Sequence, residues 1–312
     1  MGLKLACAGS LPPMGDPIRY PFSHIEFWLE KLISYRYCIV GTGEPGGRER
    51  HGLVERFTRD MEGVEIRFTG SKAKSYCTGR IRPKPDLGGS EEILEVKHLA
   101  KVAPGGVLLK ATITDPVTIG FELVANDPSL ARRYPEIYED VEKAIEPIVL
   151  AISDYVDVVQ FDCPSHLARP IREPWKHLNE LSRKVRKRTW LHIDGDVSKM
   201  FPALLKEYDV DVINLNIHGK EEENNLKAIA NFGKALEERG KKLAPAVVNT
   251  QISDDVLEVE AVETILSRIV KLSSFLDLGE LEAVTPGCGL RILGNATQTI
   301  LERLRDAVGK LD

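Results

Sequence analysis

The sequence has no apolar run that approaches the ~20 residues of a membrane span, and it lacks the basic excess that marks nucleic-acid-binding domains. Its net charge is −5, with both signs interspersed. Its five cysteines are odd in number and irregularly spaced, which argues against a disulfide scaffold and indicates a reducing compartment. We therefore expect a cytoplasmic globular protein that binds neither membranes nor nucleic acids.

Motifs of nucleotide-dependent enzymes and of two hydrolase classes are also absent. The glycine-rich stretch 43–47 lacks the lysine and hydroxyl residue of a phosphate-binding loop, and no GxGxxG occurs. The GxSxG signature of serine hydrolases and the thiol-protease signature are missing too. The sequence therefore does not indicate a nucleotide cofactor.

Eight short segments rich in apolar and β-branched residues recur along the chain, and amphipathic helical patterns fall between most of them. The strand candidates are 3–9, 37–43, 106–114, 156–164, 189–195, 210–219, 243–250 and 281–289. The helix candidates are 24–35, 134–155, 178–187, 224–240, 258–275 and 295–311, with Asn295 as an N-cap and Gly240 as a C-terminal stop.

Alternation of strand and helix implies a parallel sheet with crossover helices, and eight units predict an α/β fold of the (β/α)8 TIM-barrel type. A doubly wound open sheet is the second candidate. Segment 61–90 does not alternate in this manner, and its turn residues predict a β-ribbon excursion after the second unit. No linker or internal repeat interrupts the chain, so we expect one catalytic barrel domain over 1–312.

Polar or thiol side chains follow nearly every predicted strand, which is where TIM barrels carry their active sites. These residues are Ser10, Glu44, Asp115, Asp162, Cys163, His192, Asp194, Asn216, His218, Asn249 and Cys288. His192 and Asp194 lie two apart on one strand and share a face, and Cys288 follows the last strand. Such a set can hold Zn²⁺ in an open catalytic site. Alternatively, the histidine makes an ordinary hydrogen bond and the cysteine is a small buried residue.

Six segments, in order along essentially the whole chain, resemble the catalytic barrel of the cobalamin-independent methionine synthases. They are GEPGGRERHGLVERFTRDMEG (43–63), KATITDPVTI (110–119), VVQFDCP (158–164), LHIDGD (191–196), DVINLN (211–216) and VTPGCGL (284–290). For the first segment, the family has a stretch with Gly-Glu, then Arg, then a Phe-containing helix. For the other five it has, in the same order, "TGPVT", "IQIDEP", a His-x-Cys pair, a strand ending in Glu and "NPDCGL".

The resemblance implies a methyltransferase that methylates the sulfur of homocysteine with Zn²⁺ as its cofactor. Matched to the family's zinc ligands, His192 and Cys288 are retained, Asp194 replaces a cysteine and Asn216 replaces the glutamate. A carboxylate still binds zinc, whereas an amide is a poor ligand. His218, two residues beyond Asn216 and facing the same way, can substitute for it.

The resemblance also implies a substrate site. Glu44 and Asp162 match the family's contacts to the substrate amino group, and Ser10 matches the serine that helps bind the carboxylate. Cys163 stands where the family has the glutamate of "IDEP". No catalytic residue is assigned beyond the metal site.

The length of the chain bears on the methyl donor. Full-length family members have two barrels, and this chain resembles the short single-barrel core forms, which implies a methyl-corrinoid or a corrinoid protein as donor rather than methyl-folate. Folate as donor would also require a general acid, and none stands out. Two alternatives remain: a methylcobamide-dependent methyltransferase acting on another thiol such as coenzyme M, and a zinc-less barrel with a binding role.

Overall fold

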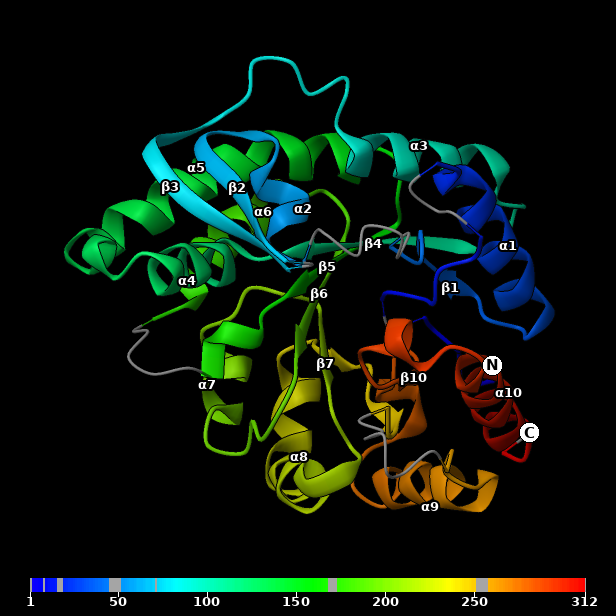
Figure 1. Ribbon diagram of the computed structural model, residues 1–312. Helices are drawn as coiled ribbons and strands as arrows, with labels where there is room; N and C mark the ends of the chain where they lie inside the picture. The colour runs from blue at the N-terminus through cyan, green and yellow to red at the C-terminus, as the bar shows by residue number, and fades with distance from the viewer. Residues whose placement is uncertain are drawn as a thin grey trace.

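A six-stranded parallel sheet forms the centre of the computed structural model, with helices arranged around it (Figure 1). The strands follow the order β1–β4–β5–β6–β7–β8, and every adjacent pair is parallel. They are β1 (Ile39–Val40), β4 (Leu108–Thr114), β5 (Val158–Asp162), β6 (Arg188–Ile193), β7 (Val212–Leu215) and β8 (Lys242–Leu243). The structure describes residues 2–7, 9–15, 19–44, 52–70, 72–167, 173–250 and 258–311.

A second parallel pair and several single bridges extend this sheet. The pair consists of β9 (Ala246–Val248) and β10 (Thr285–Pro286). Single parallel bridges join Leu5 to Val284, Ala6 to Ile39, Asn216 to Ala246 and Leu243 to Leu281. Every predicted strand segment therefore takes part in parallel pairing, and the α/β class is confirmed.

The helices lie between successive strands, as the alternation predicts. They are α1 (Pro21–Ser34), α2 (Glu55–Thr58), α3 (Glu91–Val102), α4 (Pro116–Asn126), α5 (Tyr134–Ser153), α6 (Trp175–Lys184), α7 (Phe201–Lys206), α8 (Glu222–Glu238), α9 (Val262–Ser273) and α10 (Ala296–Gly309), with 3-10 helices η1 (Pro128–Arg133), η2 (Pro164–Leu167), η3 (Gly219–Glu221), η4 (Leu278–Glu280) and η5 (Leu290–Leu293). Within the described ranges, no helix is long and apolar enough to cross a membrane.

Helix ends and short helices are where the sequence predictions fall short. Gly240 follows α8 at φ 63°, in the left-handed conformation expected of a C-terminal stop. Asn295 is the N-cap residue of α10, as predicted, although its side chain makes no capping hydrogen bond. The sequence patterns do not predict helices α2, α3, α4 and α7. Helices α2 and α7 are too short for a periodic signal. Most of α4 is buried, which hides its amphipathicity.

An antiparallel pair lies apart from the parallel sheet, within segment 61–90. Strands β2 (Met61–Thr69) and β3 (Lys72–Pro83) pair along their length, with an irregularity between Glu62 and Val64. Strand β3 packs against α4 and α5. The amide of Asn126, at the end of α4, donates a hydrogen bond of 3.1 Å to the carbonyl of Ser75 on β3.

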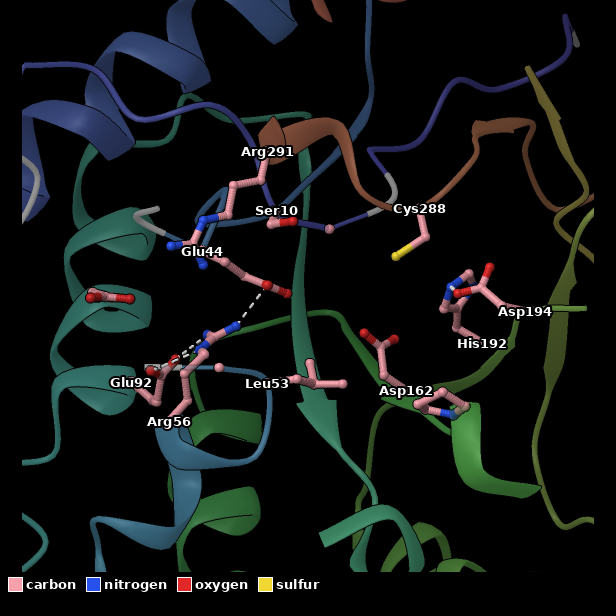
Figure 2. A pocket seen from close by; sticks show the side chains of 14 residues that line it. Ser10, Glu44, Leu53, Arg56, Glu92, Asp162, His192, Asp194, Cys288 and Arg291 are labelled. Carbon is pink, nitrogen blue, oxygen red and sulfur yellow. Dashed lines mark hydrogen bonds and ion pairs between the residues drawn. The ribbon is translucent and has the colours of Figure 1, made fainter. Parts of the chain in front are cut away.

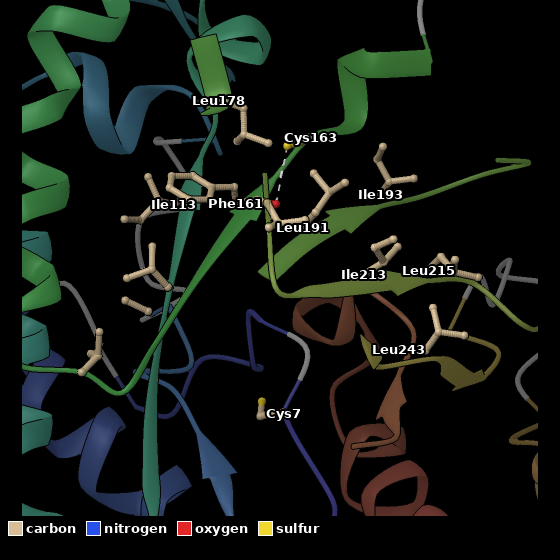
Figure 3. Packing of buried hydrophobic residues seen from close by; sticks show 14 of the residues in the cluster. Cys7, Ile113, Phe161, Cys163, Leu178, Leu191, Ile193, Ile213, Leu215 and Leu243 are labelled. Atoms are coloured by element: carbon tan, nitrogen blue, oxygen red, sulfur yellow. Dashed lines mark hydrogen bonds between the residues drawn. The ribbon is translucent and has the colours of Figure 1, made fainter. Parts of the chain in front are cut away.

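The two faces of the parallel sheet belong to different apolar clusters. On β6, Trp190 belongs to a small buried cluster and Leu191 to a large one; on β7, Val212 and Ile213 divide in the same way. Alternate residues of a strand point to opposite faces, so the large cluster fills the space under the helices (Figure 3). The small cluster occupies the inner face and comprises Ala6, Ile39, Val158, Trp190, Val212, Ala244 and Ala283.

Helices α4 and α5 pack closely at Gly120. A Cβ added to Gly120 would lie 2.4 Å from Cδ1 of the buried Tyr138 ring on α5. Alanine gains about 1 kcal/mol over glycine in an open helical position, but overpacking a core costs about 1–3 kcal/mol. We predict that Gly120→Ala lowers the midpoint of urea unfolding. Gly309→Ala is the control, because no atom lies within 4 Å of its added Cβ; a midpoint for Gly120→Ala at or above that of the wild type contradicts this account.

Candidate functional site

A pocket of about 280 Å³ lies at the carboxyl ends of the parallel strands (Figure 2). Its lining residues come from strand ends, from the loops after them, and from α2 and α3: Gly9, Ser10, Glu44, Gly52, Leu53, Arg56, Glu92, Glu95, Asp162, Pro164, His192, Asp194, Cys288 and Arg291. The structure thus brings together Ser10, Glu44, Asp162, His192, Asp194 and Cys288 from the predicted site. Asn216 and His218 are not among the lining residues.

Three of these residues form a group with metal-ligand chemistry. One ligand atom each from His192, Asp194 and Cys288 lies within 4.8 Å of the others. Strand β6 supplies His192, Asp194 follows it, and the loop after β10 brings in Cys288 (Figure 2). Nε2 of His192 is 3.4 Å from Oδ2 of Asp194.

The charges in this group are strongly coupled. Burial opposes protonation of His192, but the neighbouring Asp194 carboxylate raises the pKa of the imidazole well above its usual value. Burial also opposes ionisation of Asp194, and the charge of His192 outweighs it and lowers that pKa to about 2. Burial raises the pKa of the Cys288 thiol against the opposing influence of His192. The directions of these pKa shifts favour an imidazolium–carboxylate pair beside a protonated thiol.

Asn214 holds the ring of His192 in one orientation, a role that the sequence reasoning missed. Nδ2 of Asn214 donates to the carbonyl of Ala244 and, at 3.1 Å, to Oγ1 of Thr285. The amide oxygen of Asn214 therefore faces His192 and accepts the proton of Nδ1. Nε2 of His192, which points to the metal-ligand group, is buried and has no hydrogen-bond partner in the described part of the chain. Metal-binding histidines are held in this way, with the second nitrogen bonded to an oxygen acceptor.

Asn216 and His218 occupy different surroundings. Nδ2 of Asn216 donates to Oδ1 of Asp194 at 3.1 Å, so Asn216 supports that carboxylate from outside the group. The His218 ring is buried, and a Cβ added to Gly287 would lie 2.7 Å from its Nε2. Burial, together with the charge of Arg268, lowers the pKa of His218 to about 4. The structure does not bring His218 into the metal-ligand group.

Glu44 enters the pocket from the segment that follows β1. Gly43 and Glu44 have φ values of 71° and 45°, and a positive φ is unusual for glutamate. Oε2 of Glu44 lies 2.8 Å from Nη1 of Arg56, and Oε1 is buried without a hydrogen-bond partner among the described residues. The segment 45–51, part of the first resembling motif, lies outside the described residues.

Arg56 and Glu92 were not predicted as pocket residues. Nε of Arg56 donates to Oε1 of Glu92 at 3.0 Å, and a second ion pair joins the same two side chains. Burial opposes the charge of Arg56, but Glu92 and Glu44 raise its pKa well above the usual value. Both residues lie on helices, α2 and α3, and inspection of the strand ends could not reveal them.

Asp162 ends β5 and faces the metal-ligand group across the sheet. It pairs in register with His192, and Nε2 of Gln160 donates to its Oδ1 at 2.8 Å. Burial raises the pKa of Asp162 to about 6, and His192 and Gln160 act in the opposite direction. Ser10 lies near Glu44 at the mouth of the pocket (Figure 2).

A second group of potential ligands, Asp115, Cys163 and His166, is fully buried away from the pocket. Asp115 accepts hydrogen bonds from the first turn of α4, and its Oδ2 lies 2.7 Å from Nε2 of His166. Nδ1 of His166 bonds Tyr208 at 2.8 Å. Cys163 belongs to the large apolar cluster (Figure 3). These hydrogen bonds identify the group as a structural connection between α4 and η2.

Comparison with known proteins agrees with the predicted resemblance, although no protein-family model matches the sequence. A methionine synthase from Methanocaldococcus jannaschii is 26 % identical over 264 residues, covering 79 % of this chain and 76 % of that protein. The structure of a B12-independent methionine synthase from Shewanella sp. W3-18-1, in complex with selenomethionine, matches with a TM-score of 0.78 and 17 % identity over 100 % of this chain and 98 % of that chain.

A second solved structure gives the same fold. A putative vitamin-B12-independent methionine synthase from Listeria monocytogenes matches with a TM-score of 0.66 and 15 % identity over 99 % of both chains. The chain is therefore related in sequence to a methionine synthase and has the fold of B12-independent methionine synthases, which confirms the resemblance seen in its motifs and the prediction of a methyltransferase.

Proposed function

We propose that this protein is a methionine synthase-like methyltransferase that transfers a methyl group to the zinc-activated thiolate of homocysteine. The observation that carries this proposal is one pocket that combines the group His192, Asp194 and Cys288 with two carboxylates, Glu44 and Asp162. The first set suits a metal and a thiol, and the second suits an ammonium.

The residues present fit a zinc ion. Imidazole, carboxylate and thiolate are accepted zinc ligands, and three protein ligands leave a fourth position for a substrate sulfur. The buried Nε2 of His192, 3.4 Å from Oδ2 of Asp194, is the atom that would ligate, since Asn214 holds the proton on Nδ1. When bound there, zinc supplies a Lewis acid that lowers the pKa of a coordinating thiol.

The other pocket residues would bind and orient the amino acid. Oε1 of Glu44 is a buried acceptor in need of a donor, and the ammonium of homocysteine supplies one. Nη1 of Arg56 lies 2.8 Å from the opposite oxygen of Glu44, which fixes the carboxylate. Asp162 would accept a second ammonium proton, and Ser10 would bind the substrate carboxylate.

We also infer that the sheet closes as a (β/α)8 barrel in a single catalytic domain, 1–312, with β2–β3 as an excursion. The bridges at Leu5, Ala6 and Leu243 support closure, because they connect the N-terminal segment and the last strand to the six-stranded sheet. The small inner cluster also supports it, since its members come from seven strand segments.

For the methyl donor we favour a methyl-corrinoid or a corrinoid protein over methyl-folate, since corrinoid is a good leaving group that needs no acid.

Coenzyme M as acceptor is disfavoured, because its sulfonate would meet the carboxylates of Glu44 and Asp162. A zinc-less barrel with a binding role is the remaining alternative.

Zinc content tests the metal group directly. We predict about one zinc per chain in the purified wild type, and loss of most of it, with at least a tenfold loss of methyl transfer, in Cys288→Ala. Cys163→Ala is the matched control, because this thiol is buried but outside the pocket. Elemental analysis after dialysis against a weak chelator measures both. Equal zinc in the two variants, or none in the wild type, contradicts the assignment.

The effect of Asn214 on the metal-ligand group can be distinguished from its effect on the stability of the fold. We predict that Asn214→Leu weakens zinc affinity about 10–100-fold, because His192 loses the acceptor that fixes its tautomer. Asn179→Leu is the control: it also removes a buried amide that bonds Glu207 and Asp209, but far from the pocket. Competition with a chromophoric chelator gives the affinities. Similar weakening in both variants would show that Asn214 acts only through the fold.

The ammonium site can be tested with a substrate analogue that lacks the amine. We predict that Glu44→Gln raises the KM for homocysteine about 10–100-fold, the value of a charge-assisted hydrogen bond, while the KM for 4-mercaptobutyrate stays within about threefold. Steady-state kinetics with both thiols and a methyl-corrinoid donor provide the comparison. A parallel rise for both thiols contradicts an ammonium contact, and turnover of coenzyme M in preference to homocysteine favours the alternative acceptor.

A further inference from the structure

A lysine is fully buried on the inner face of the sheet, below the pocket. Lys110, on β4, is 1 % exposed, which is rare for a lysine unless its charge is paired. Its Nζ donates to the carbonyl of Cys7 and, at 2.6 Å, to Oε1 of Gln160. Nζ also lies 5.1 Å from the centroid of the Trp190 ring, a cation–π distance. Burial lowers the pKa of Lys110, and the charge of Asp162 acts in the opposite direction and favours the ammonium form. The proposed reaction does not use this interior amine.

Lys110 determines which way the side-chain amide of Gln160 points. An ammonium has donors but no acceptor, so it selects the oxygen of the amide. The NH2 end of Gln160 then faces Asp162, two residues along β5 on the same face, and donates to Oδ1 at 2.8 Å. With the amide reversed, its oxygen would face the carboxylate and repel it. The chain of hydrogen bonds from Lys110 through Gln160 to Asp162 is therefore favourable in only one orientation of the Gln160 amide.

Among the described residues, hydrogen bonding engages one oxygen of Asp162 and leaves the other open to a ligand. Oδ1 is occupied by Gln160, and no hydrogen bond to Oδ2 is present within the described residues. Burial raises the pKa of this carboxyl to about 6, while the hydrogen bond from Gln160 and the charge of Lys110 both favour the ionised form. Lys110 and Gln160 thus lower the pKa of Asp162 against the effect of burial, and the hydrogen bond from Gln160 restricts rotation of the carboxylate.

We propose that Lys110 and Gln160 are positioning residues that hold Asp162 so that its Oδ2 accepts a proton from the ammonium of the bound amino acid. This inference rests on the proposed function, because it assigns Asp162 to the substrate amine. It adds a specificity device placed beneath the substrate rather than in contact with it. A merely structural polar interior would instead affect stability without distinguishing amine-bearing thiols from others.

The test uses Gln160→Met, which keeps the length of the side chain and removes both polar atoms. In the zinc-loaded protein we expect the Kd of homocysteine, measured by calorimetry, to rise about tenfold, while the Kd of 4-mercaptobutyrate and the zinc content stay unchanged. In the Asp162→Asn background the same substitution should add less than about twofold, because residues that act as a unit are not additive.

Lys110→Met tests the origin of the orientation and has a matched control. We expect it to reproduce the effect of Gln160→Met on homocysteine. Lys241→Met should not, since Lys241 is a second buried lysine that donates to the carbonyls of Tyr208 and Val210, away from the pocket. If Lys110→Met fails to fold, Gln160→Met still decides the question.

The outcomes separate this inference from the proposed function. A wild type that binds homocysteine, with a Gln160→Met variant that binds it equally well, overturns the inference alone. So does an effect of Gln160→Met that is just as large in the Asp162→Asn background. A zinc-loaded wild type that does not bind homocysteine overturns the proposed function, and this inference with it.

Discussion

The register of three parallel strands is the constraint on which the candidate site depends. Asp162 on β5 pairs with His192 on β6, and His192 pairs with Asn214 on β7. Because the side-chain period of a strand is two, a slip of one residue would turn each of these side chains to the helix-covered face. The same register places Trp190 and Val212 one layer lower on the same inner face. The same strand register is therefore needed to pack that apolar layer and to place the polar groups above it.

The inner face changes from apolar to polar toward the pocket, and His192 and Asp162 each have an amide partner that limits their orientation. Asn214 accepts from His192 because its amide nitrogen is engaged by Ala244 and Thr285. Gln160 donates to Asp162 because its oxygen is engaged by Lys110. In a low-dielectric interior such networks are strong when every member is satisfied and costly when one is not. The groups presented to the pocket are thus held from below, by residues that no ligand needs to touch.

Sequence reasoning found the residues that follow strand ends and missed those that support them. The strand segments followed from apolar runs, which are a local property. Positions after strand ends made His192, Asp194 and Cys288 candidates, and the resemblance to the family assigned them to a metal. Lys110, Gln160 and Asn214 lie inside strands, where only the partner across the sheet shows what they do. His218 lies three residues beyond the end of β7, and the structure leaves it outside the group formed by His192, Asp194 and Cys288.

The two departures from the resembling family's ligand pattern belong together. Where that pattern has a cysteine and a glutamate, this chain has Asp194 and Asn216, and the amide of Asn216 donates to the carboxylate of Asp194 at 3.1 Å. A glutamate at 216 would instead set two carboxylates against each other, and one of them would resist ionisation. The exchange removes one negative charge from the group and converts a repulsive contact into a hydrogen bond. An ion held by His192, Asp194 and Cys288 would then keep more of its positive charge for a substrate thiol, lowering the thiol pKa while making the resulting thiolate less nucleophilic.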